Sequence, residues 1–352
     1  MRAARMYGYK QPLRLEDIPI PDIAPDEVLI KVGAAGMCRT DFQLVDGYFA
    51  GLKADFPITP GHEIAGWIDR IGSGVPEHLG LSEGDLVVAE GAWGDELCRQ
   101  CHEGNQQICV HGRWAGFGPH GGYAEYVPVP ARHVIRVDSP DLTPEMLAPL
   151  TDAGLTPYRG IKKLAKAGAL GPGRNVAVLG IGALGAYAVQ YAKLIGAGST
   201  VIALARSQEK LELAQRNGAD FIINTTGKSV DELRKELARL TGKPELDGII
   251  DCAGAEETIR MGFALLAREG VFVSVGLVGN RIDIPLFPLV SRELTYHGSF
   301  WGNYNDLTEV IALAKRGDIK HSTMRVAFED INESLEQLGH GDFVGRAVIV
   351  YA

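Results

Sequence analysis

Three cysteines and an aspartate lie close together in the sequence and could bind one metal ion. Cys98 and Cys101 are three residues apart, Asp95 precedes them by three residues, and Cys109 follows eight residues after Cys101. Two cysteines at this spacing on a turn can chelate one ion, and the following loop can return a further ligand to complete a tetrahedron. Exposed, unligated thiols this close together would oxidise readily. The segment therefore predicts a closed, structural zinc site.

A second set of possible metal ligands is spread over the first part of the chain. Cys38 stands in GMCRTD, His62 and Glu63 stand in PGHEIAG, and Asp152 stands in PLTDAGLTPY. A thiolate, an imidazole and a carboxylate are ligand types of a catalytic zinc that keeps one coordination position open. Each residue alone also has an ordinary explanation, as a core cysteine, a buried histidine, a solvated charge or a helix cap. The spacing of these residues in the sequence does not by itself show that they bind the same ion.

The stretch NVAVLGIGALG, residues 175–185, combines a strand with a glycine-rich turn. Gly180, Gly182 and Gly185 have the GxGxxG spacing that opens a helix in dinucleotide-binding domains. In that motif the glycines allow a tight turn, a close approach of backbone amides to a pyrophosphate, and close packing of the helix on the sheet. Because the chain has 44 glycines, the motif alone could be an ordinary turn. The helix and the second apolar run that follow it, TVIALA, favour the dinucleotide site.

The end of that second run indicates which dinucleotide binds. A domain that prefers NAD usually has Asp or Glu here, about 20 residues past the glycines, to bind the ribose. Ala205 takes this place and is followed by Arg206 and Ser207, so no carboxylate would repel a 2′-phosphate and a guanidinium could bind it. We therefore expect NADP to be preferred, with Ala183 and Leu184 of the glycine loop completing its site. If Arg206 is only a solvated surface residue, NAD remains possible.

Two kinds of pattern indicate the elements that position these residues. The first part of the chain has short apolar runs broken by Gly, Pro and Asp, which predict a β-rich domain. The middle part alternates strands with helices, one of them opened by a capping box of Ser229 and Glu232, and predicts a doubly wound parallel sheet. The last part looks like a return to the first domain. We therefore expect an α/β protein with domains at 1–153 and 154–289, and a segment 290–352 that completes the first domain.

Composition limits the class of ligand and the cellular setting. The chain has 352 residues, of which 46% are hydrophobic and 22% charged, as in an ordinary globular protein of two domains. A formal net charge of −9 without a dense basic block argues against nucleic acid or an anionic membrane as partner. No run approaches the roughly 18 apolar residues of a membrane span. Five cysteines, three of them crowded together, fit metal binding in a reducing compartment, so we expect a cytoplasmic protein with a small-molecule ligand.

Taken together and in this order, the motifs resemble those of the zinc-dependent medium-chain alcohol dehydrogenases. The resemblance covers essentially the whole chain and rests on CRTD, GHE, the cysteine-rich lobe, TDAGLTPY and GIGALG. It implies a Rossmann domain inserted between two pieces of a GroES-like β domain, with the active site between the domains. It also implies that subunits pair through the edge of the Rossmann sheet, near Arg281 to Pro285, to give a homodimer or homotetramer.

The resemblance also implies roles for individual residues. The catalytic zinc would have three ligands and a neighbour that enters the coordination sphere in some members: Cys38, His62, Asp152 and, as that neighbour, Glu63. Thr40 would relay the alcohol proton, and Asp41 would orient the zinc histidine. Arg39 and Arg346 would bind the cofactor. With the lobe, two zinc ions per chain are expected. The chain departs from the usual pattern where Asp95 replaces a cysteine of the lobe and Gln43 a histidine of the proton relay.

The expected reaction is reversible hydride transfer between a primary or secondary alcohol and NAD(P), with an alcohol, aldehyde or ketone as partner. Zinc lowers the pKa of bound water to about 7, and an alcohol should respond similarly. The alternatives are a zinc polyol or sugar dehydrogenase, a zinc-free quinone or enone reductase, and a dinucleotide-binding protein without catalysis. Phe49, Trp93 and Trp301 either line an apolar pocket, which would argue against a polyol, or belong to the core.

Overall fold

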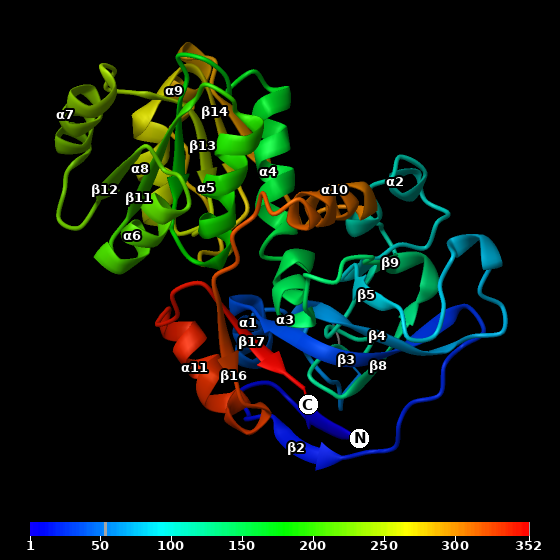
Figure 1. Cartoon of the computed structure of the whole chain (residues 1–352). Coiled ribbons are helices and arrows are strands. Elements are labelled where there is room, and N and C mark those ends of the chain that lie inside the picture. Colours follow the sequence, from blue (N-terminus) through cyan, green and yellow to red (C-terminus); the bar gives the residue numbers. More distant parts are fainter. Residues whose placement is uncertain (53–54, 352) are drawn as a thin grey trace. The chain divides into compact units, whose positions relative to one another are not determined.

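The computed structural model describes residues 1–52 and 55–351, which form two compact units. The first unit contains Met1–Leu155 and the residues from Gly302 onward, and the second unit contains Thr156–Trp301 (Figure 1). The second unit is therefore inserted between two pieces of the first. Among the described residues, no helix is both long enough and apolar enough to cross a membrane.

The first unit is built on a seven-stranded sheet in the order β16-β17-β3-β4-β5-β9, with β8 also paired to β3. Neighbouring strands are antiparallel except β16 and β17, which are parallel. The strands are β3 (Glu27–Met37), β4 (Glu63–Ile71), β5 (Leu86–Ala89), β8 (Tyr126–Pro130), β9 (Val134–Arg136), β16 (Thr323–Val326) and β17 (Arg346–Val350). Two small sheets pair β1 (Arg2–Arg5) with β2 (Arg14–Asp17) and β6 (Ala92–Trp93) with β7 (Arg113–Trp114).

Helices of the first unit are short and lie between or after the strands. The α-helices are α1 (Arg39–Asp46), α2 (Arg99–His102), α3 (Pro144–Leu147), α10 (Tyr304–Lys315) and α11 (Ile331–His340). Short 3₁₀ turns are η1 (Ala50–Leu52), η2 (Glu77–Leu79), η3 (Gln106–Ile108), η4 (Ala131–His133), η5 (Ala148–Thr151) and η6 (Phe328–Asp330). A buried apolar cluster that includes Ile30, Met37, Ile64 and Ile349 joins the sheet to α1 and α11.

The second unit is a six-stranded parallel sheet in the order β12-β11-β10-β13-β14-β15. Its strands are β10 (Asn175–Leu179), β11 (Thr200–Ala205), β12 (Phe221–Asn224), β13 (Leu246–Asp251), β14 (Leu266–Ser274) and β15 (Thr295–Gly298). Its helices are α4 (Leu155–Lys166), α5 (Ala183–Ile195), α6 (Gln208–Arg216), α7 (Val230–Thr241), α8 (Glu256–Leu265) and α9 (Leu286–Ser291). In chain order the strands run 3-2-1-4-5-6, which is the doubly wound Rossmann order. The expected α/β class is confirmed.

The sequence predicts a helix start more reliably than it predicts which sheet a strand joins. The capping box at α7 is present, because Ser229 Oγ accepts a hydrogen bond from the Glu232 amide at 3.3 Å and the Glu232 carboxylate accepts one from the Ser229 amide at 2.8 Å. The expected boundary after residue 289 differs from the structure, because β15 pairs with β14 and completes the second unit. A short apolar run shows that a strand forms but not which sheet it joins.

The register of β3 on β4 brings together residues that the sequence separates. Gly36 pairs with Glu63, so the end of β3, which leads into Cys38, lies opposite the start of β4, which follows His62. The register shifts near Gly33, and a Cβ added to Gly66 there would lie 2.1 Å from the Lys31 carbonyl oxygen. Only glycine therefore fits at position 66.

Replacing Gly66 by alanine should destabilise the first unit, because a backbone carbonyl cannot move aside as a flexible side chain can. We expect Gly66→Ala to lower the free energy of unfolding by about 1–3 kcal/mol, the usual cost of overpacking. Chemical unfolding followed by circular dichroism measures this. Gly118→Ala is the matched control, since an added Cβ there meets no atom within 4 Å. Equal unfolding midpoints for the two variants would contradict the register argument.

Candidate metal and cofactor sites

Cys38, His62 and Asp152 converge inside the first unit. Cys38 precedes α1, His62 precedes β4 and Asp152 follows η5. The Cys38 Sγ atom lies 3.4 Å from Asp152 Oδ2, and His62 Nε2 lies 3.5 Å from the same oxygen. All three side chains are buried, and their ligand atoms lie within 4.8 Å of one another.

This arrangement fits a catalytic zinc. Bonds of about 2.0–2.3 Å from zinc to N, O and S ligands place tetrahedral ligand atoms roughly 3.3–3.8 Å apart, as the two measured separations are. Three protein ligands leave the fourth position open for water or substrate. The donor set of thiolate, imidazole and carboxylate is therefore suited to Lewis-acid chemistry.

Asp41 holds the histidine of this cluster. Its Oδ1 lies 3.0 Å from His62 Nδ1, so in a neutral imidazole with its proton on Nδ1 the lone pair of Nε2 could bind a metal. Burial lowers the pKa of His62, but the Asp41 and Asp152 carboxylates more than offset burial and raise this pKa well above its usual value. A cation bound at Nε2 must displace a proton held there, so metal binding at this site would release protons.

Glu63 and Arg346 form a buried ion pair beside the cluster. Arg346 Nε donates to Glu63 Oε2 at 2.9 Å, and Arg346 Nη2 donates to Glu63 Oε1 and, at 2.9 Å, to Asp152 Oδ2. The Ala153 amide also donates to Glu63 Oε1 at 2.8 Å. Burial raises the pKa of Glu63 to about 7, although Arg346 opposes this rise.

Glu63 and Arg346 contact each other, and their expected roles at the zinc and at the cofactor stay predictions. The group of close ligand atoms contains Cys38, His62 and Asp152 but not Glu63, whose carboxylate is bound to a guanidinium instead. Arg346, expected at the cofactor, is buried against the two carboxylates. The physical reason is electrostatic, because a buried carboxylate beside a second carboxylate requires a cation.

Polar and aromatic side chains surround the cluster. Thr40 Oγ1 lies 3.3 Å from Cys38 Sγ, so a hydroxyl stands beside one candidate ligand. The Phe117 ring centroid is 5.7 Å from that of His62, and Phe49 packs edge-to-face on Phe117 at 5.4 Å. Arg39 Nε is buried and has no hydrogen-bond partner among the described residues. These groups offer one hydroxyl and an apolar wall to a ligand.

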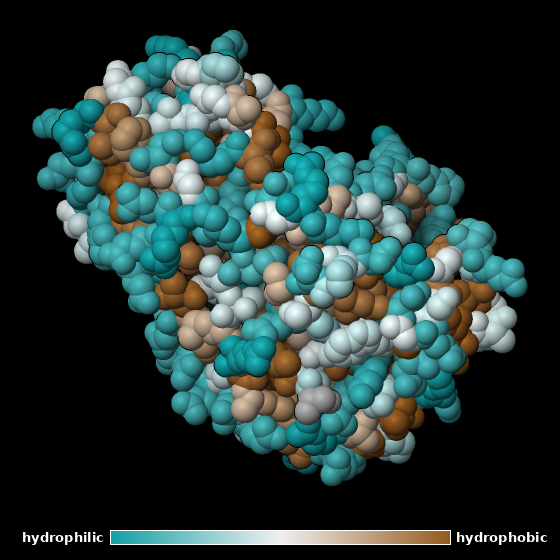
Figure 2. All heavy atoms as spheres, viewed as in Figure 1, coloured by the Kyte–Doolittle hydropathy of each residue, from teal (hydrophilic) through white to brown (hydrophobic). Residues whose placement is uncertain are grey.

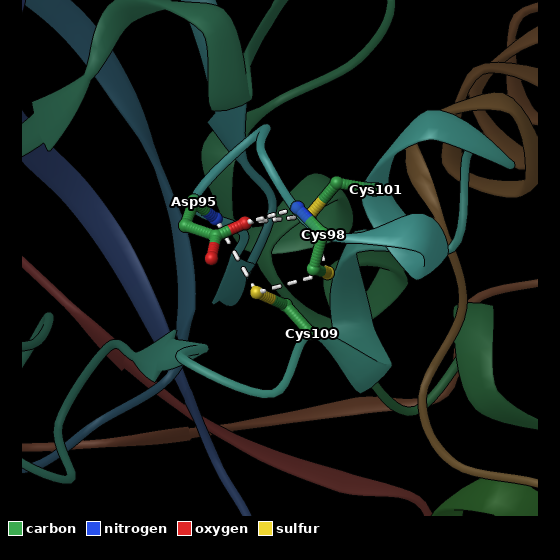
Figure 3. Close-up of side chains that lie close together, drawn as sticks. All are labelled: Asp95, Cys98, Cys101 and Cys109. Atoms are coloured by element: carbon green, nitrogen blue, oxygen red, sulfur yellow. Dashed lines mark hydrogen bonds between the residues drawn. The ribbon is translucent and has the colours of Figure 1, made fainter.

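The cysteine-rich lobe gathers its four expected ligands (Figure 3). Cys98 Sγ lies 3.6 Å from both Cys101 Sγ and Cys109 Sγ, and Cys101 Sγ lies 3.5 Å from Asp95 Oδ1. The Leu97 and Cys98 amides donate to Asp95 Oδ1 at 2.9 and 3.1 Å. Four donor atoms this close form a closed set, which is typical of structural zinc sites.

His111 is a neighbour of the lobe that the sequence analysis did not include. Its Nδ1 lies 2.7 Å from Asp95 Oδ2, and its amide donates to Cys109 Sγ at 3.4 Å. The hydrogen bond from His111, together with the backbone amides, holds the pKa of Asp95 well below its usual range. The only sequence signal was a histidine two residues after the last cysteine.

In the second unit, the glycine loop has the geometry that a dinucleotide needs. Gly180 has a φ of +80°, and a Cβ on it would lie 2.8 Å from that of Ala253. A Cβ on Gly185 would lie 2.1 Å from the Gly180 carbonyl oxygen, whereas one on Gly182 would meet no atom within 4 Å. The turn and the helix packing therefore require glycine at 180 and 185, and open space lies over Gly182.

The start of α5 is available to a phosphate. Gly182 is its N-cap and no side chain caps it, so the amides of the first turn, beginning with Ala183 and Leu184, have no side-chain partner. The helix follows β10, which pairs with both β11 and β13 where the strand order reverses. Ligands of doubly wound sheets bind outside the carboxyl ends of the strands, at the point where the strand order reverses.

The end of β11 presents the residues expected to select the cofactor. Arg206 is exposed, and its backbone carbonyl accepts hydrogen bonds from Asn224 Nδ2 at 3.1 Å and Thr226 Oγ1 at 3.3 Å. Ser207 caps α6, with its Oγ accepting from the Lys210 amide at 3.5 Å. The turn is thus held through the Arg206 backbone, while the Arg206 residue is exposed.

Comparisons with known proteins found two matching family models and relatives similar over nearly the whole chain. The model of the alcohol dehydrogenase GroES-like domain matches residues 24–139, and that of the zinc-binding dehydrogenase matches residues 183–316. An NAD-dependent alcohol dehydrogenase of Sulfurisphaera tokodaii is 36% identical over 99% of this chain and 100% of its own. A D-arabinose 1-dehydrogenase (NADP(+)) of Saccharolobus solfataricus is 34% identical over 99% of this chain and 97% of its own.

A solved structure is similar over the full length as well. The alcohol dehydrogenase of Aeropyrum pernix superimposes with a TM-score of 0.91 at 35% identity, and the match covers 100% of both chains. The order of motifs, the two unit folds and these full-length similarities all agree. The chain therefore belongs to the zinc-dependent medium-chain alcohol dehydrogenase family.

Proposed function

We propose that this protein catalyses reversible hydride transfer between a primary or secondary alcohol and a nicotinamide dinucleotide. The observation that carries the proposal is the convergence of Cys38, His62 and Asp152 into a three-ligand site beside the Thr40 hydroxyl. A zinc ion bound there would act as a Lewis acid and lower the pKa of an alcohol at its open position. Similarity to proteins named alcohol dehydrogenases supports the same reaction.

Other residues of the chain would orient the metal ligand, transfer the proton and exclude water. Asp41 keeps His62 in the tautomer and orientation that point Nε2 at the metal position. Thr40 Oγ1 can accept a hydrogen bond from a substrate oxygen and pass its proton toward the cofactor ribose. The Phe117 and Phe49 rings exclude water from one side, which strengthens electrostatic stabilisation of the developing alkoxide.

The alternative is a sugar or polyol dehydrogenase on the same machinery. Similarity to a protein named D-arabinose 1-dehydrogenase favours it. The aromatic pair beside His62 argues against it, because a polyol needs several hydrogen-bond partners. A spectrophotometric screen of simple alcohols, ketones and aldoses against both NAD(H) and NADP(H) separates the two candidates.

We also propose a second, structural zinc in the lobe, which gives two ions per chain. The closeness of Asp95, Cys98, Cys101 and Cys109 supports it. A carboxylate is a harder ligand than the usual fourth thiolate. The contact of His111 with Asp95 offsets this weakness by fixing one carboxylate oxygen.

We further propose NADP as the preferred cofactor and a homodimer or homotetramer as the working form. The absence of a carboxylate at Ala205 and the exposed Arg206 support NADP. Large apolar side chains stand exposed on α9, beside the β15 edge of the sheet: Leu286, Phe287 and Val290. Elsewhere, on the face in Figure 2, apolar residues lie in small groups among hydrophilic ones. An exposed apolar helix at a sheet edge favours pairing of subunits there.

Replacing Cys38 by serine should abolish most turnover and leave the fold intact, because an open catalytic site does not hold the core together. Lewis-acid stabilisation amounts to several kcal/mol, so we expect a loss in kcat of about 10³-fold or more. Turnover, circular dichroism and metal content test this. Cys252→Ser removes a cysteine outside both clusters and should keep the full metal content. A Cys38→Ser protein with near-normal turnover would overturn the assignment.

Replacing Cys109 by serine should release one of two zinc ions and lower the melting temperature, because a closed site contributes folding free energy. Affinity for the cofactor should change little, since the lobe belongs to the first unit and the glycine loop to the second. Elemental analysis, thermal unfolding and cofactor titration measure the three quantities. Fully active wild-type protein with no more than one zinc per chain would refute a metal in the lobe.

Replacing Arg206 by alanine should weaken NADPH binding selectively. Hydrogen bonds to a charged group contribute about 1.5–3 kcal/mol, so NADPH affinity should fall by about 10- to 150-fold while NADH affinity stays nearly constant. Fluorescence titration with both cofactors measures this. Arg239→Ala, which removes an exposed arginine from α7, is the matched control. Equal losses for NADPH and NADH, or a wild-type kcat/KM that favours NADH, would show that Arg206 does not select the cofactor.

A further inference from the structure

The Asp41 carboxylate beside the candidate catalytic metal centre contacts three other groups: an imidazole, a backbone amide and a phenol. Its Oδ1 faces His62 Nδ1 at 3.0 Å. Its Oδ2 accepts two hydrogen bonds, from the Cys38 amide at 2.9 Å and from the Tyr123 hydroxyl at 2.8 Å. Both residues that Asp41 joins, Cys38 and His62, are candidate ligands. Among the described partners of this carboxylate, Tyr123 has no role in the function proposed above.

Tyr123 is held against the segment that carries His62. The chain through Gly121 to Tyr123 runs alongside residues 59–61, with three backbone hydrogen bonds of 2.7–3.0 Å between them. Gly61 has a φ of +94°, and a Cβ on it would lie 2.5 Å from the Tyr123 ring. The ring therefore packs directly on the turn before His62 and has no solvent exposure.

The hydroxyl of Tyr123 acts as a donor in this position. Burial raises the pKa of Tyr123 well above its usual value, and the Asp41 carboxylate raises it further, so the phenol keeps its proton. A carboxylate held at Oδ2 by two donors cannot rotate about its terminal bond without losing both. Rotation would turn Oδ1 away from His62, so the two donors at Oδ2 fix the direction of the histidine.

We propose that Tyr123 is a positioning residue of the catalytic metal centre: its hydroxyl fixes the Asp41 carboxylate, which in turn aims His62 at the metal. The inference rests on the proposed zinc-dependent function. A hydroxyl that only satisfies a buried carboxylate would influence stability alone. A positioning hydroxyl also influences how long the metal stays bound and the symmetry of its ligand field.

The test compares two tyrosines of the first unit whose hydroxyls donate inside the same core. Tyr123→Phe deletes the bond to Asp41 and keeps the ring. Tyr351→Phe is the matched control, because the Tyr351 hydroxyl donates to the Gly122 carbonyl oxygen at 2.9 Å, one residue from Tyr123, and does not contact Asp41. Zinc release from the holoenzyme to a chromogenic chelator is followed over time, and the catalytic phase is the one that Cys38→Ser lacks.

We expect Tyr123→Phe to speed the catalytic phase of zinc release by several-fold, below the roughly 10- to 100-fold effect of removing a direct partner of a ligand, as in Asp41→Ala. The visible absorption bands of the cobalt-substituted enzyme should shift in Tyr123→Phe and not in Tyr351→Phe. Both tyrosine variants should lose similar amounts of thermal stability. In an Asp41→Ala background, Tyr123→Phe should cause no further change in zinc release.

Three outcomes overturn the inference. A Tyr123→Phe protein with the wild-type rate of zinc release and the wild-type cobalt spectrum shows that the hydroxyl has a structural role only. An undiminished effect in the Asp41→Ala background shows that Tyr123 does not act through Asp41. A wild-type protein without a zinc-release phase that depends on Cys38 overturns the proposed function together with this inference, and so is distinguishable from the first two outcomes.

Discussion

The antiparallel register of β3 and β4 is the constraint on which the candidate metal centre depends. Pairing of Gly36 with Glu63 brings Cys38 and His62 to neighbouring strand ends. A Cβ on Gly36 would lie 1.7 Å from Glu63 Oε2, so this crossing leaves room for a buried carboxylate only because glycine stands opposite it. A shift of one residue would point the side chains of β4 to the other face and separate the ligands. Backbone pairing therefore brings two of the three candidate ligands, Cys38 and His62, close to each other.

Charge balance is the second requirement, and the last strand of the chain satisfies it. Asp41, Glu63 and Asp152 are buried carboxylates within one small region, which is costly unless cations accompany them. Arg346, at the start of β17, donates to both Glu63 and Asp152. With Arg346 paired to Glu63, the carboxylates of Asp41 and Asp152 remain, and a bound divalent ion would balance their charge. The returning C-terminal segment thus supplies charge to the metal centre as well as a strand to the sheet.

The lobe shows how a substituted ligand can be kept in place. Two backbone amides and one imidazole hold the two carboxylate oxygens of Asp95. The imidazole belongs to His111, whose backbone amide also donates a hydrogen bond to Cys109 Sγ. His111 therefore contacts two members of the lobe. An exposed pair of this kind contributes little by itself, but it restricts the orientation of a carboxylate that must meet three thiolates. Among the described residues, the hydrogen bonds of the Asp95 carboxylate come from the same short stretch of chain as the three cysteines.

The sequence by itself determined the features that depend on neighbours along the chain. The glycine loop, the capping box of Ser229 and Glu232, and the lobe ligands from Asp95 to Cys109 could be predicted because turn geometry and helix periodicity act over a few residues. The tertiary structure alone decided which distant groups meet. It joined Cys38 to Asp152 across 114 positions and Tyr123 to Asp41 across 82, and it paired Glu63 with Arg346 across 283. It also placed β15 in the second unit, because hydrophobic patterning gives the buried face of a strand and not its neighbour.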